Sequence, residues 1–257
     1  MTTFVVWRQR QPRSGWVSLL AVDSSGATVQ AMLAASADTA GMHFDISARP
    51  ALLKHDPFKA LVVPRPIGWI GSIDAQGRPN LAPYSFFNAV SDRPPMLMFS
   101  SGGHKDSLRN IEATGEFTCS LASWDLREAM NLSSAPLAPG VDEFAAAGLA
   151  TAASLRVRAP RVAAAPAALE CRLWRTLDLP GSRYTVVFGE VVAIHIDDRF
   201  VRDGRVDTGA MRILSRLGYM DYGVLEAADI FTLQRPLASD DGQTAVPPPA
   251  EWDGVHR

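Results

Sequence analysis

The sequence predicts a mostly β protein with short helices, arranged as a closed or partly open antiparallel barrel. Three observations favour this fold class. From about residue 58, short apolar runs alternate with turn residues, which is typical of proteins built from many short strands. Helical patterns are few and short, and strands do not alternate regularly with long helices. No Gly-x-Gly-x-x-Gly turn opens a helix, which argues against a doubly wound dinucleotide-binding fold.

The first two strands are predicted to form a hairpin. Residues 67–73 are an apolar run that follows two prolines, and residues 74–77 supply an Asp…Gly turn. Residues 78–84 are the return strand. Because Pro79 and Pro83 have no amide donor, we expect this strand to be irregular or to lie at a sheet edge.

Later strands are predicted, in chain order, at residues 86–90, 96–101, 116–121, 168–177, 184–196 and 231–233. Pro180-Gly181 joins the two long ones, and Gly189 within the second suggests a bulge of the kind found where a sheet closes on itself. Helices are predicted at residues 105–115, 125–132 and 142–147. Asp106 or Ser107 is expected to cap the first of these, and Gly115 to end it.

The pattern of apolar, polar and turn residues divides the chain into three parts. Residues 1–41 carry no firm strand–turn pattern, and we expect an N-terminal extension that packs poorly and precedes the true start at Met42. Residues 42–237 are the expected folded domain, and residues 238–257 a loose C-terminal tail. A basic N-terminus before an apolar stretch resembles a signal peptide, but Asp23 interrupts the stretch. We therefore expect a cytoplasmic protein.

Composition excludes several function classes. The formal net charge of −2 at pH 7 argues against nucleic-acid binding, which needs a basic excess. No apolar run reaches the roughly 18–20 residues of a membrane span. Two cysteines, Cys119 and Cys171, are too few for a disulfide framework and are expected to be small buried hydrophobes. Five scattered histidines give no support to a metal site.

The block from Ser100 to Asn110 is the most informative for chemistry. Ser100 and Ser101 end a strand, two glycines follow, and Lys105 then precedes a helix start. Lys105 is one of only 3 lysines beside 22 arginines. Free backbone amides, the positive end of a helix dipole, hydroxyls and an ammonium suit a phosphate monoester. The alternative interpretation is a capped helix after a flexible loop.

A second block, from Asn80 to Ser91, places Ser85 and Asn88 within an apolar, aromatic stretch. Because alternate residues of a strand share a face, Ser85, Asn88 and Ser91 cannot all point one way. Some can meet the polar edge of a planar ligand whose rings lie on apolar walls. The alternative is ordinary core with satisfied polar groups.

Three motifs, in this order, resemble the flavin reductase-like family: Pro64-Arg65-Pro66-Ile67-Gly68-Trp69-Ile70, Asn80-Leu81-Ala82-Pro83-Tyr84-Ser85-Phe86-Phe87-Asn88, and Pro94-Pro95 with Lys105-Asp106-Ser107-Leu108-Arg109-Asn110-Ile111. The resemblance runs from about Pro57 to Pro236, and residues 1–41 have no counterpart in it. Members are FMN-binding split-barrel proteins, including the reductase components of two-component monooxygenases. The resemblance implies a six-stranded Greek-key split barrel, a homodimer with FMN near its interface, and a partner monooxygenase.

By position, the resemblance implies that Ser85 and Asn88 bond the flavin and that Ser101, Lys105 and Ser107 hold its phosphate. The full set of expected cofactor-binding residues is Tyr84, Ser85, Asn88, Ser100, Ser101, Lys105, Asp106 and Ser107.

The implied activity is that of an NAD(P)H-dependent flavin reductase, in which NADH or NADPH passes hydride to flavin N5. His195, Tyr219 and Tyr222 are candidates for the nicotinamide side, and no catalytic side chain is predicted. The structural alternatives are a backbone-bonded strand histidine and core-filling tyrosines. The alternative function is a flavin-binding electron carrier or storage module without nicotinamide-dependent turnover.

Overall fold

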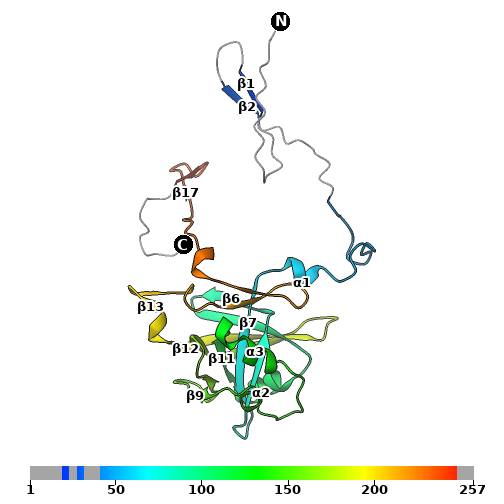
Figure 1. Ribbon diagram of the computed structural model, residues 1–257, viewed down its shortest axis with the longest axis vertical. Coiled ribbons are helices and arrows are strands. Elements are labelled where there is room, and N and C mark those ends of the chain that lie inside the picture. The colour runs from blue at the N-terminus through cyan, green and yellow to red at the C-terminus, as the bar shows by residue number, and fades with distance from the viewer. Residues whose placement is uncertain (1–18, 23–27, 32–40, 248–257) are drawn as a thin grey trace. The chain divides into compact units, whose positions relative to one another are not determined.

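A computed structural model describes residues 19–22, 28–31 and 41–247 of the chain (Figure 1). The chain divides into two units, Met1–His55 and Asp56–Arg257. The candidate functional residues all belong to the second unit.

In the first unit, β1 (Leu19–Val22) and β2 (Thr28–Ala31) pair as an antiparallel hairpin. This hairpin departs from the expectation of no firm strand–turn pattern before Met42. The sequence between the strands, Asp23-Ser24-Ser25-Gly26, is a turn-type cluster between two β-capable runs, and that combination is a hairpin signal. Most of residues 1–41 lie outside the described residues, so their poor packing and the limits of the folded domain stay predictions.

A seven-stranded antiparallel sheet dominates the second unit (Figure 1). In spatial order its strands are β5 (Pro79–Tyr84), β4 (Gly68–Ile73), β8 (Glu116–Leu121), β11 (Ala167–Asp178), β12 (Tyr184–Ile196), β7 (Pro95–Gly102) and β6 (Phe87–Asp92). Consecutive strands β5 and β6 lie at opposite edges, and β11 and β12 separate β7 from β8, which is a Greek-key connectivity. The prediction of a mostly β, antiparallel fold is confirmed, with seven strands in the sheet where six were expected.

Two local predictions about this sheet are confirmed. Strand β5, which contains Pro79 and Pro83, lies at a sheet edge, where a missing amide donor costs no ladder hydrogen bond. The pairing of β11 with β12 changes register between Phe188 and Gly189, where Trp174 of β11 is the extra residue. A Cβ on Gly189 would lie 2.7 Å from Cε1 of Phe117, so glycine is needed beside the bulge because the Phe117 ring packs against β12 there.

One buried core unites the sheet with helix α2 (Asp106–Thr114). The core consists of Ile70, Tyr84, Leu97, Phe99, Leu108, Ile111, Phe117, Cys119, Cys171 and Val187. Because strands near both edges of the sheet reach the same core, the sheet curls around it. The two cysteines are buried within it, as predicted, and burial raises the pKa of the Cys119 thiol to about 12.

A second buried cluster packs on the other side of β4 and β5. It contains Trp69, Leu81, Met130 and Phe144 among others. Its covering elements are a 3₁₀ turn (Trp124–Leu126), α3 (Arg127–Leu132) and α4 (Glu143–Ala146). The two helices predicted from the sequence between residues 125 and 147 are therefore present, the first with a 3₁₀ start.

The remaining elements are small. They are α1 (Phe58–Leu61); a three-stranded sheet of β3 (Arg65–Pro66), β15 (Leu214–Arg216) and β16 (Tyr222–Val224); hairpin pairs β9 (Thr151–Ala152) with β10 (Arg161–Val162), β13 (Val201–Arg202) with β14 (Arg205–Val206), and β17 (Leu237–Ala238) with β18 (Ala245–Val246); and 3₁₀ turns at Asp198–Phe200 and Ala227–Asp229. The strand predicted at residues 231–233 is wrong. Phe231 and Leu233 are 81% and 85% exposed, and no strand of the described residues pairs with them. The last described strands, β17 and β18, lie instead mostly within the predicted tail.

Helix α2 ends as predicted, at Gly115, whose φ of 73° is left-handed. Its start differs from the prediction. The N-cap residue is Lys105, and no side chain caps the helix. Asp106 and Ser107 lie inside the first turn, and their side chains bond to other segments of the chain. Within the described part of the chain, no helix is long and apolar enough to cross a membrane.

Candidate functional site

A cleft of about 580 Å³ opens where β7 ends and α2 begins. We call it the first cleft. Its floor comes from Tyr84, Ser85 and Phe86 at the end of β5, and its side from Ser100 and from residues 105–107. Residues 133–137 and Pro139 cover it from the other side. A cavity of this size with converging polar groups is typical of a small-molecule site.

The structure brings most of the predicted cofactor-binding residues together around this cleft. Those that line it are Tyr84, Ser85, Ser100, Lys105, Asp106 and Ser107. Ser101 does not line it, because its side chain is buried and its hydroxyl donates to the carbonyl of Gly103 at 2.8 Å. Asn88 is exposed on β6, and its Oδ1 accepts the backbone N–H of Ala89 at 2.9 Å.

The start of α2 supplies donors suited to an anion. No side chain caps the helix, so the first backbone N–H groups lack an intrahelical partner and stand at the positive end of the helix dipole. The Lys105 side chain adds a positive charge to the cleft wall, and Ser107 adds a hydroxyl. That hydroxyl is held in place because it accepts Nδ2–H of the buried Asn80 at 2.9 Å. The donor set fits the phosphate of a nucleotide.

Two aromatic rings also line the cleft. Phe86 and Tyr184 both line it, and their ring centroids are 5.6 Å apart. Tyr184 reaches the cleft because β12 pairs it with Gly102 of β7. Sequence reasoning missed Tyr184, since only the pairing of two strands far apart in the chain brings it there. An apolar, aromatic wall beside an anion site suits a ligand with a planar ring system and a phosphate tail.

Tyr84 contributes an unusual polar atom. Its hydroxyl is buried and meets no described residue at hydrogen-bonding geometry. Burial raises the pKa of the Tyr84 phenol, and the neighbouring hydroxyls of Ser107 and Ser101 oppose that rise. Because the hydroxyl is buried against Ser101 and Ser107, Tyr84 contributes other atoms of its side chain or backbone to the cleft lining. The residues present therefore fit a phosphorylated ring compound such as a flavin nucleotide.

Glu143 is a buried carboxyl in the same cleft, and sequence reasoning missed it. It lies in the first turn of α4, which Asp142 caps by accepting the N–H of Ala145 at 3.2 Å. Its Oε2 accepts the backbone N–H of Leu81 on edge strand β5 at 3.1 Å. Burial raises the pKa of Glu143, and the hydrogen bond from Leu81 opposes the rise. The sequence signal for its position is weak, because the contact spans two distant segments.

The segment 133–140 covers the first cleft and is held at both ends. At one end, the Trp69 indole N–H donates to the Ser133 hydroxyl at 2.9 Å, and that hydroxyl donates to the carbonyl of Met130 at 2.8 Å. At the other end, the backbone N–H of Gly140 donates to Oδ2 of Asp106 at 3.0 Å. The cover is therefore anchored on the barrel and on helix α2.

The three residues predicted for the nicotinamide side do not line the first cleft. Tyr184 begins β12, and His195 lies near its other end. At roughly 3.3 Å per residue, the two ends of this strand are on the order of 30–40 Å apart. Burial and the nearby Arg161 lower the pKa of His195, and the carboxylates of Asp197, Asp198 and Glu170 oppose this.

Tyr219 and Tyr222 lie in and after the turn that follows β15. This turn packs on α1, where a Cβ on Gly218 would lie 2.9 Å from Cα of Ala60. The buried guanidinium of Arg65 links the same two segments by donating to the carbonyls of Val62 at 2.6 Å and Leu217 at 2.8 Å. Lys59 of α1 lines the first cleft, and the turn that carries the tyrosines packs against α1 and does not line the cleft itself.

Fold and site together define a split-barrel protein with a nucleotide-type cleft at the start of its main helix. Comparison with known proteins gives the family. Residues 60–214 match the flavin reductase like domain, and the chain belongs to the flavin reductase-like family. The resemblance inferred from the three motifs and the split-barrel fold class are thereby confirmed.

Known relatives agree with this assignment. An uncharacterized protein of Deinococcus radiodurans is 41% identical over 188 residues, which cover 68% of this chain and 82% of the relative. Nitrilotriacetate monooxygenase component B from Bacillus cereus superposes with a TM-score of 0.69 at 27% identity, covering 75% of this chain and 98% of that one. The 2-nitrobenzoate 2-nitroreductase NbaA from Pseudomonas fluorescens superposes with a TM-score of 0.68 at 29% identity, covering 77% and 100%.

Proposed function

We propose that this protein is an FMN-binding NAD(P)H:flavin oxidoreductase. The observation that carries the proposal is the first cleft, in which Lys105, the Ser107 hydroxyl and the uncapped start of α2 stand beside the rings of Phe86 and Tyr184. Family membership supports a flavin as the ligand. When bound, the flavin supplies a hydride acceptor at N5, and NADH or NADPH supplies the hydride.

The chain's own residues have positioning roles in this proposal. Lys105, Ser107 and the backbone amides of α2 hold the phosphate, with Ser101 buried beneath them fixing the turn through Gly103. Ser85 faces polar atoms of the ligand, and Tyr84 packs beneath them. Residues 133–137 and Pro139 also line the cleft, and a bound ligand enclosed by them would make stronger polar contacts than it would in water.

A homodimer belongs to the same proposal. Trp174 on β11 and Ile194 on β12 are 62% and 61% exposed, and adjacent strands that present large apolar side chains to solvent are typical of a contact surface. Asn88 and His195 lie outside the first cleft of their own chain, so a second copy is the means by which they would meet the ligand.

A partner oxygenase is the proposed consumer of the reduced flavin. One structural relative is component B of nitrilotriacetate monooxygenase, and that name supports a reductase that works with a second component. Direct reduction of a substrate on the bound flavin is also consistent with a relative named as a nitroreductase.

The alternative is a flavin-binding electron carrier or storage module without nicotinamide-dependent turnover. The placement of His195, Tyr219 and Tyr222 outside the first cleft favours it, because no described residue of the cleft is then assigned to the nicotinamide.

One spectroscopic experiment tests the proposal. The purified protein is reconstituted with FMN, and its absorption near 450 nm is followed on anaerobic mixing with NADH and with NADPH. Bleaching at catalytic rates supports the reductase. Flavin that binds but stays oxidised supports the carrier, and a protein that binds no flavin contradicts both.

A further inference from the structure

A buried network of amide and hydroxyl side chains lies beneath the first turn of α2. Asn80 on β5 is 5% exposed, and its Nδ2 donates to Oγ of Ser107 at 2.9 Å and to Oγ of Ser72 at 3.2 Å. Ser72 on β4 is fully buried, and its Oγ also accepts Nδ2–H of Asn110 on α2 at 3.3 Å. The network thus joins β4 and β5 to α2 and ends at Ser107, which lines the first cleft.

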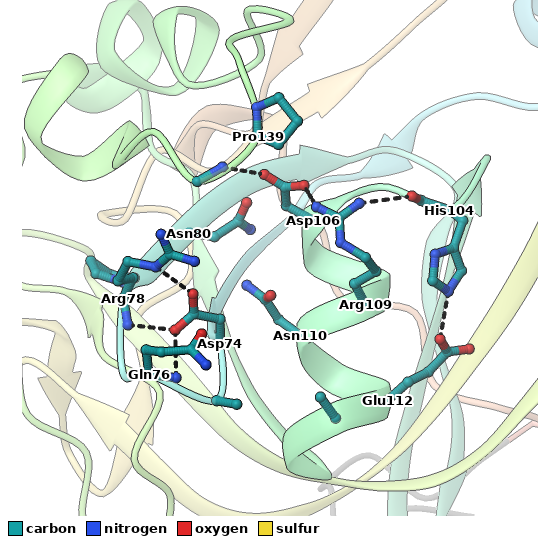
Figure 2. Close-up of a pocket in the computed structure, with 14 residues that line it drawn as sticks. Asp74, Gln76, Arg78, Asn80, His104, Asp106, Arg109, Asn110, Glu112 and Pro139 are labelled. Carbon is teal, nitrogen blue, oxygen red and sulfur yellow. Dashed lines mark hydrogen bonds and ion pairs between the residues drawn. The ribbon is translucent and has the colours of Figure 1, made fainter.

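The two amides of this network also line a second cleft, of about 590 Å³. Figure 2 shows Asn80 and Asn110 in its wall, between the turn that joins β4 to β5 and helix α2. The charged side chains drawn there pair with one another. Asn80 lines the first cleft as well, so it belongs to the wall that the two clefts share.

The direction of each hydrogen bond decides what the Ser107 hydroxyl has left to offer. An amide nitrogen only donates, whereas a hydroxyl accepts through its oxygen and donates a single hydrogen. Because Nδ2–H of Asn80 occupies an acceptor position of Ser107, the hydroxyl hydrogen of Ser107 remains to be donated. The nearby Tyr84 hydroxyl, which meets no described residue at hydrogen-bonding geometry, does not accept it.

We propose that Asn80 is a positioning residue that directs the hydroxyl hydrogen of Ser107 at the phosphate of the bound flavin nucleotide. This inference rests on the proposed function, in which Lys105, Ser107 and the start of α2 hold that phosphate. Since the amide holds its acceptor side, the Ser107 hydroxyl meets the ligand as a donor, and a phosphate supplies three strong acceptor oxygens. Asn80 therefore favours phosphorylated flavins over riboflavin without adding a charge to the cleft.

Burial fixes the Asn80 amide in this orientation. Its other donor bond goes to Ser72, and Asn110 holds the same Ser72 oxygen, so turning the amide would break two bonds of the network. Ser107 itself is only 1% exposed. A hydrogen bond to a charged acceptor is stronger than one between neutral groups, and it gains strength where water is excluded. One correctly directed hydroxyl thus makes a measurable difference to phosphate binding.

The inference is tested by comparing FMN with riboflavin, which differ by the phosphate alone. Asn80→Ala removes the donor to Ser107. Asn110→Ala is the matched control, because Asn110 is a buried amide of the same network that does not bond to Ser107. Ser107→Ala and the double variant Asn80→Ala/Ser107→Ala complete a cycle that shows whether one residue acts through the other. Dissociation constants of both flavins are measured on the full chain by calorimetric titration, and thermal unfolding checks that each variant folds.

We expect Asn80→Ala to weaken FMN binding about tenfold, the effect of one lost hydrogen bond to a charged group, and riboflavin binding by less than about twofold. Ser107→Ala should weaken FMN binding to a similar extent. The double variant should bind FMN no more weakly than either single variant, because Asn80 acts through Ser107. Asn110→Ala should keep the wild-type ratio of FMN to riboflavin affinity, whatever its effect on the unfolding temperature.

Asn80→Asp is a second variant, which keeps the size of the side chain but accepts a hydrogen where the amide donates one. It should also lose the preference for FMN, because its carboxylate takes the Ser107 hydrogen. In the Ser107→Ala background the same change should weaken FMN binding less, since only the repulsion between carboxylate and phosphate remains.

Other outcomes overturn the inference in distinct ways. Additive losses in the double variant mean that Asn80 contacts the ligand directly, since it lines the first cleft itself. Equal losses of FMN and riboflavin affinity in Asn80→Ala mean that the amide only supports the fold of the cleft. A wild-type ratio in Asn80→Asp means that Asn80 accepts from Ser107 rather than donating to it. A wild type that binds neither flavin contradicts the proposed function itself.

Discussion

The Oδ2 atom of Asp106 accepts the backbone N–H of Gly140 at 3.0 Å, which joins the first turn of α2 to the cover of the first cleft. The other carboxylate oxygen of Asp106 accepts from Arg109 one turn further along the helix. Gly140 has a φ of 80°, a left-handed conformation that glycine adopts without strain. Asp106 thus bonds both within its own helix and to the cover, and it does not cap the helix.

Removing this contact should loosen the cover. We expect Asp106→Ala to speed flavin dissociation about fivefold, the effect of losing about 1 kcal/mol from one charge-assisted hydrogen bond at a partly exposed site. Cleavage by a protease within residues 133–140 should also become faster. Asp106→Asn is the control, because its amide oxygen still accepts from Gly140. If stopped-flow measurements show that flavin dissociates equally fast from Asp106→Ala and from Asp106→Asn, the hydrogen bond to Gly140 does not hold the cover.

Lys105 supplies the positive charge next to the uncapped start of α2. Reversing this charge places a carboxylate beside the proposed phosphate, so Lys105→Glu should weaken flavin binding by about tenfold or more. Riboflavin, which lacks the phosphate, should bind both proteins alike. Lys54→Glu is the matched control for net charge, since Lys54 is exposed and lines neither cleft. Unchanged flavin affinity of Lys105→Glu in a titration removes Lys105 from the site.

Local signals in the sequence account for most of the barrel. The apolar run before Asp74, the Asp…Gly turn and the prolines of β5 predict a hairpin at a sheet edge, and the structure has one there. Gly189 likewise marks an irregular point of β12, since the Phe117 ring approaches closely there and the pairing with β11 changes register beside it. Residues 231–233 show the limit of such signals. Two apolar residues that alternate with one polar residue do not form a strand when no described strand lies beside them to pair with.

The residues of the candidate site also fall into two groups, those found from local sequence signals and those brought in by long-range contacts. Tyr84, Ser85, Ser100, Lys105 and Ser107 lie in two short blocks whose composition already suggests a ligand. Tyr184 and Glu143 reach the first cleft only through long-range contacts, the first by pairing with β7 and the second by bonding to Leu81. Because such contacts depend on the topology of the whole sheet, one sequence without its fold does not reveal them. The Asp106 cap prediction failed for a related reason, since a distant N–H competes for the carboxylate.

Tyr222 is the residue through which the nicotinamide assignment is best tested. Its ring lies 4.4 Å from the guanidinium carbon of Arg216 and does not line the first cleft, but it belongs to the segment that packs against α1. If this segment positions the nicotinamide, Tyr222→Ala should slow anaerobic flavin reduction about tenfold. Flavin affinity should change less, and Tyr222→Phe, which keeps the ring, should behave as wild type. A stopped-flow rate unaffected by Tyr222→Ala excludes this role.

Gly189 is a sensitive point for barrel stability. A Cβ there would enter the contact with Phe117, a ring buried in the main core, and the ring has no space to retreat among its neighbours. We expect Gly189→Ala to lower the free energy of unfolding by about 1–3 kcal/mol, the usual cost of overpacking. Gly223→Ala is the control, because the nearest atom to its Cβ is the movable Ser215 hydroxyl at 3.1 Å. Urea denaturation that gives similar values for both variants would contradict a close contact at Phe117.

Glu143 should make stability depend on pH. Burial raises its pKa in the folded protein above the value in the unfolded chain, so the folded state binds more protons between these two values. Stability contributed by this group is therefore fully present at low pH and falls as the pH rises through the raised pKa. Gln at this position carries no charge and still accepts the Leu81 N–H through its amide oxygen.

We accordingly expect the free energy of unfolding of Glu143→Gln, relative to wild type, to increase from pH 4 to pH 7. Urea denaturation across that range measures it, and Glu128→Gln serves as the control because the Glu128 side chain is 80% exposed. A difference between Glu143→Gln and wild type that stays constant with pH would mean that the carboxyl is not protonated more readily in the folded state. A decrease would mean that the hydrogen bond from Leu81 outweighs the burial of the charge.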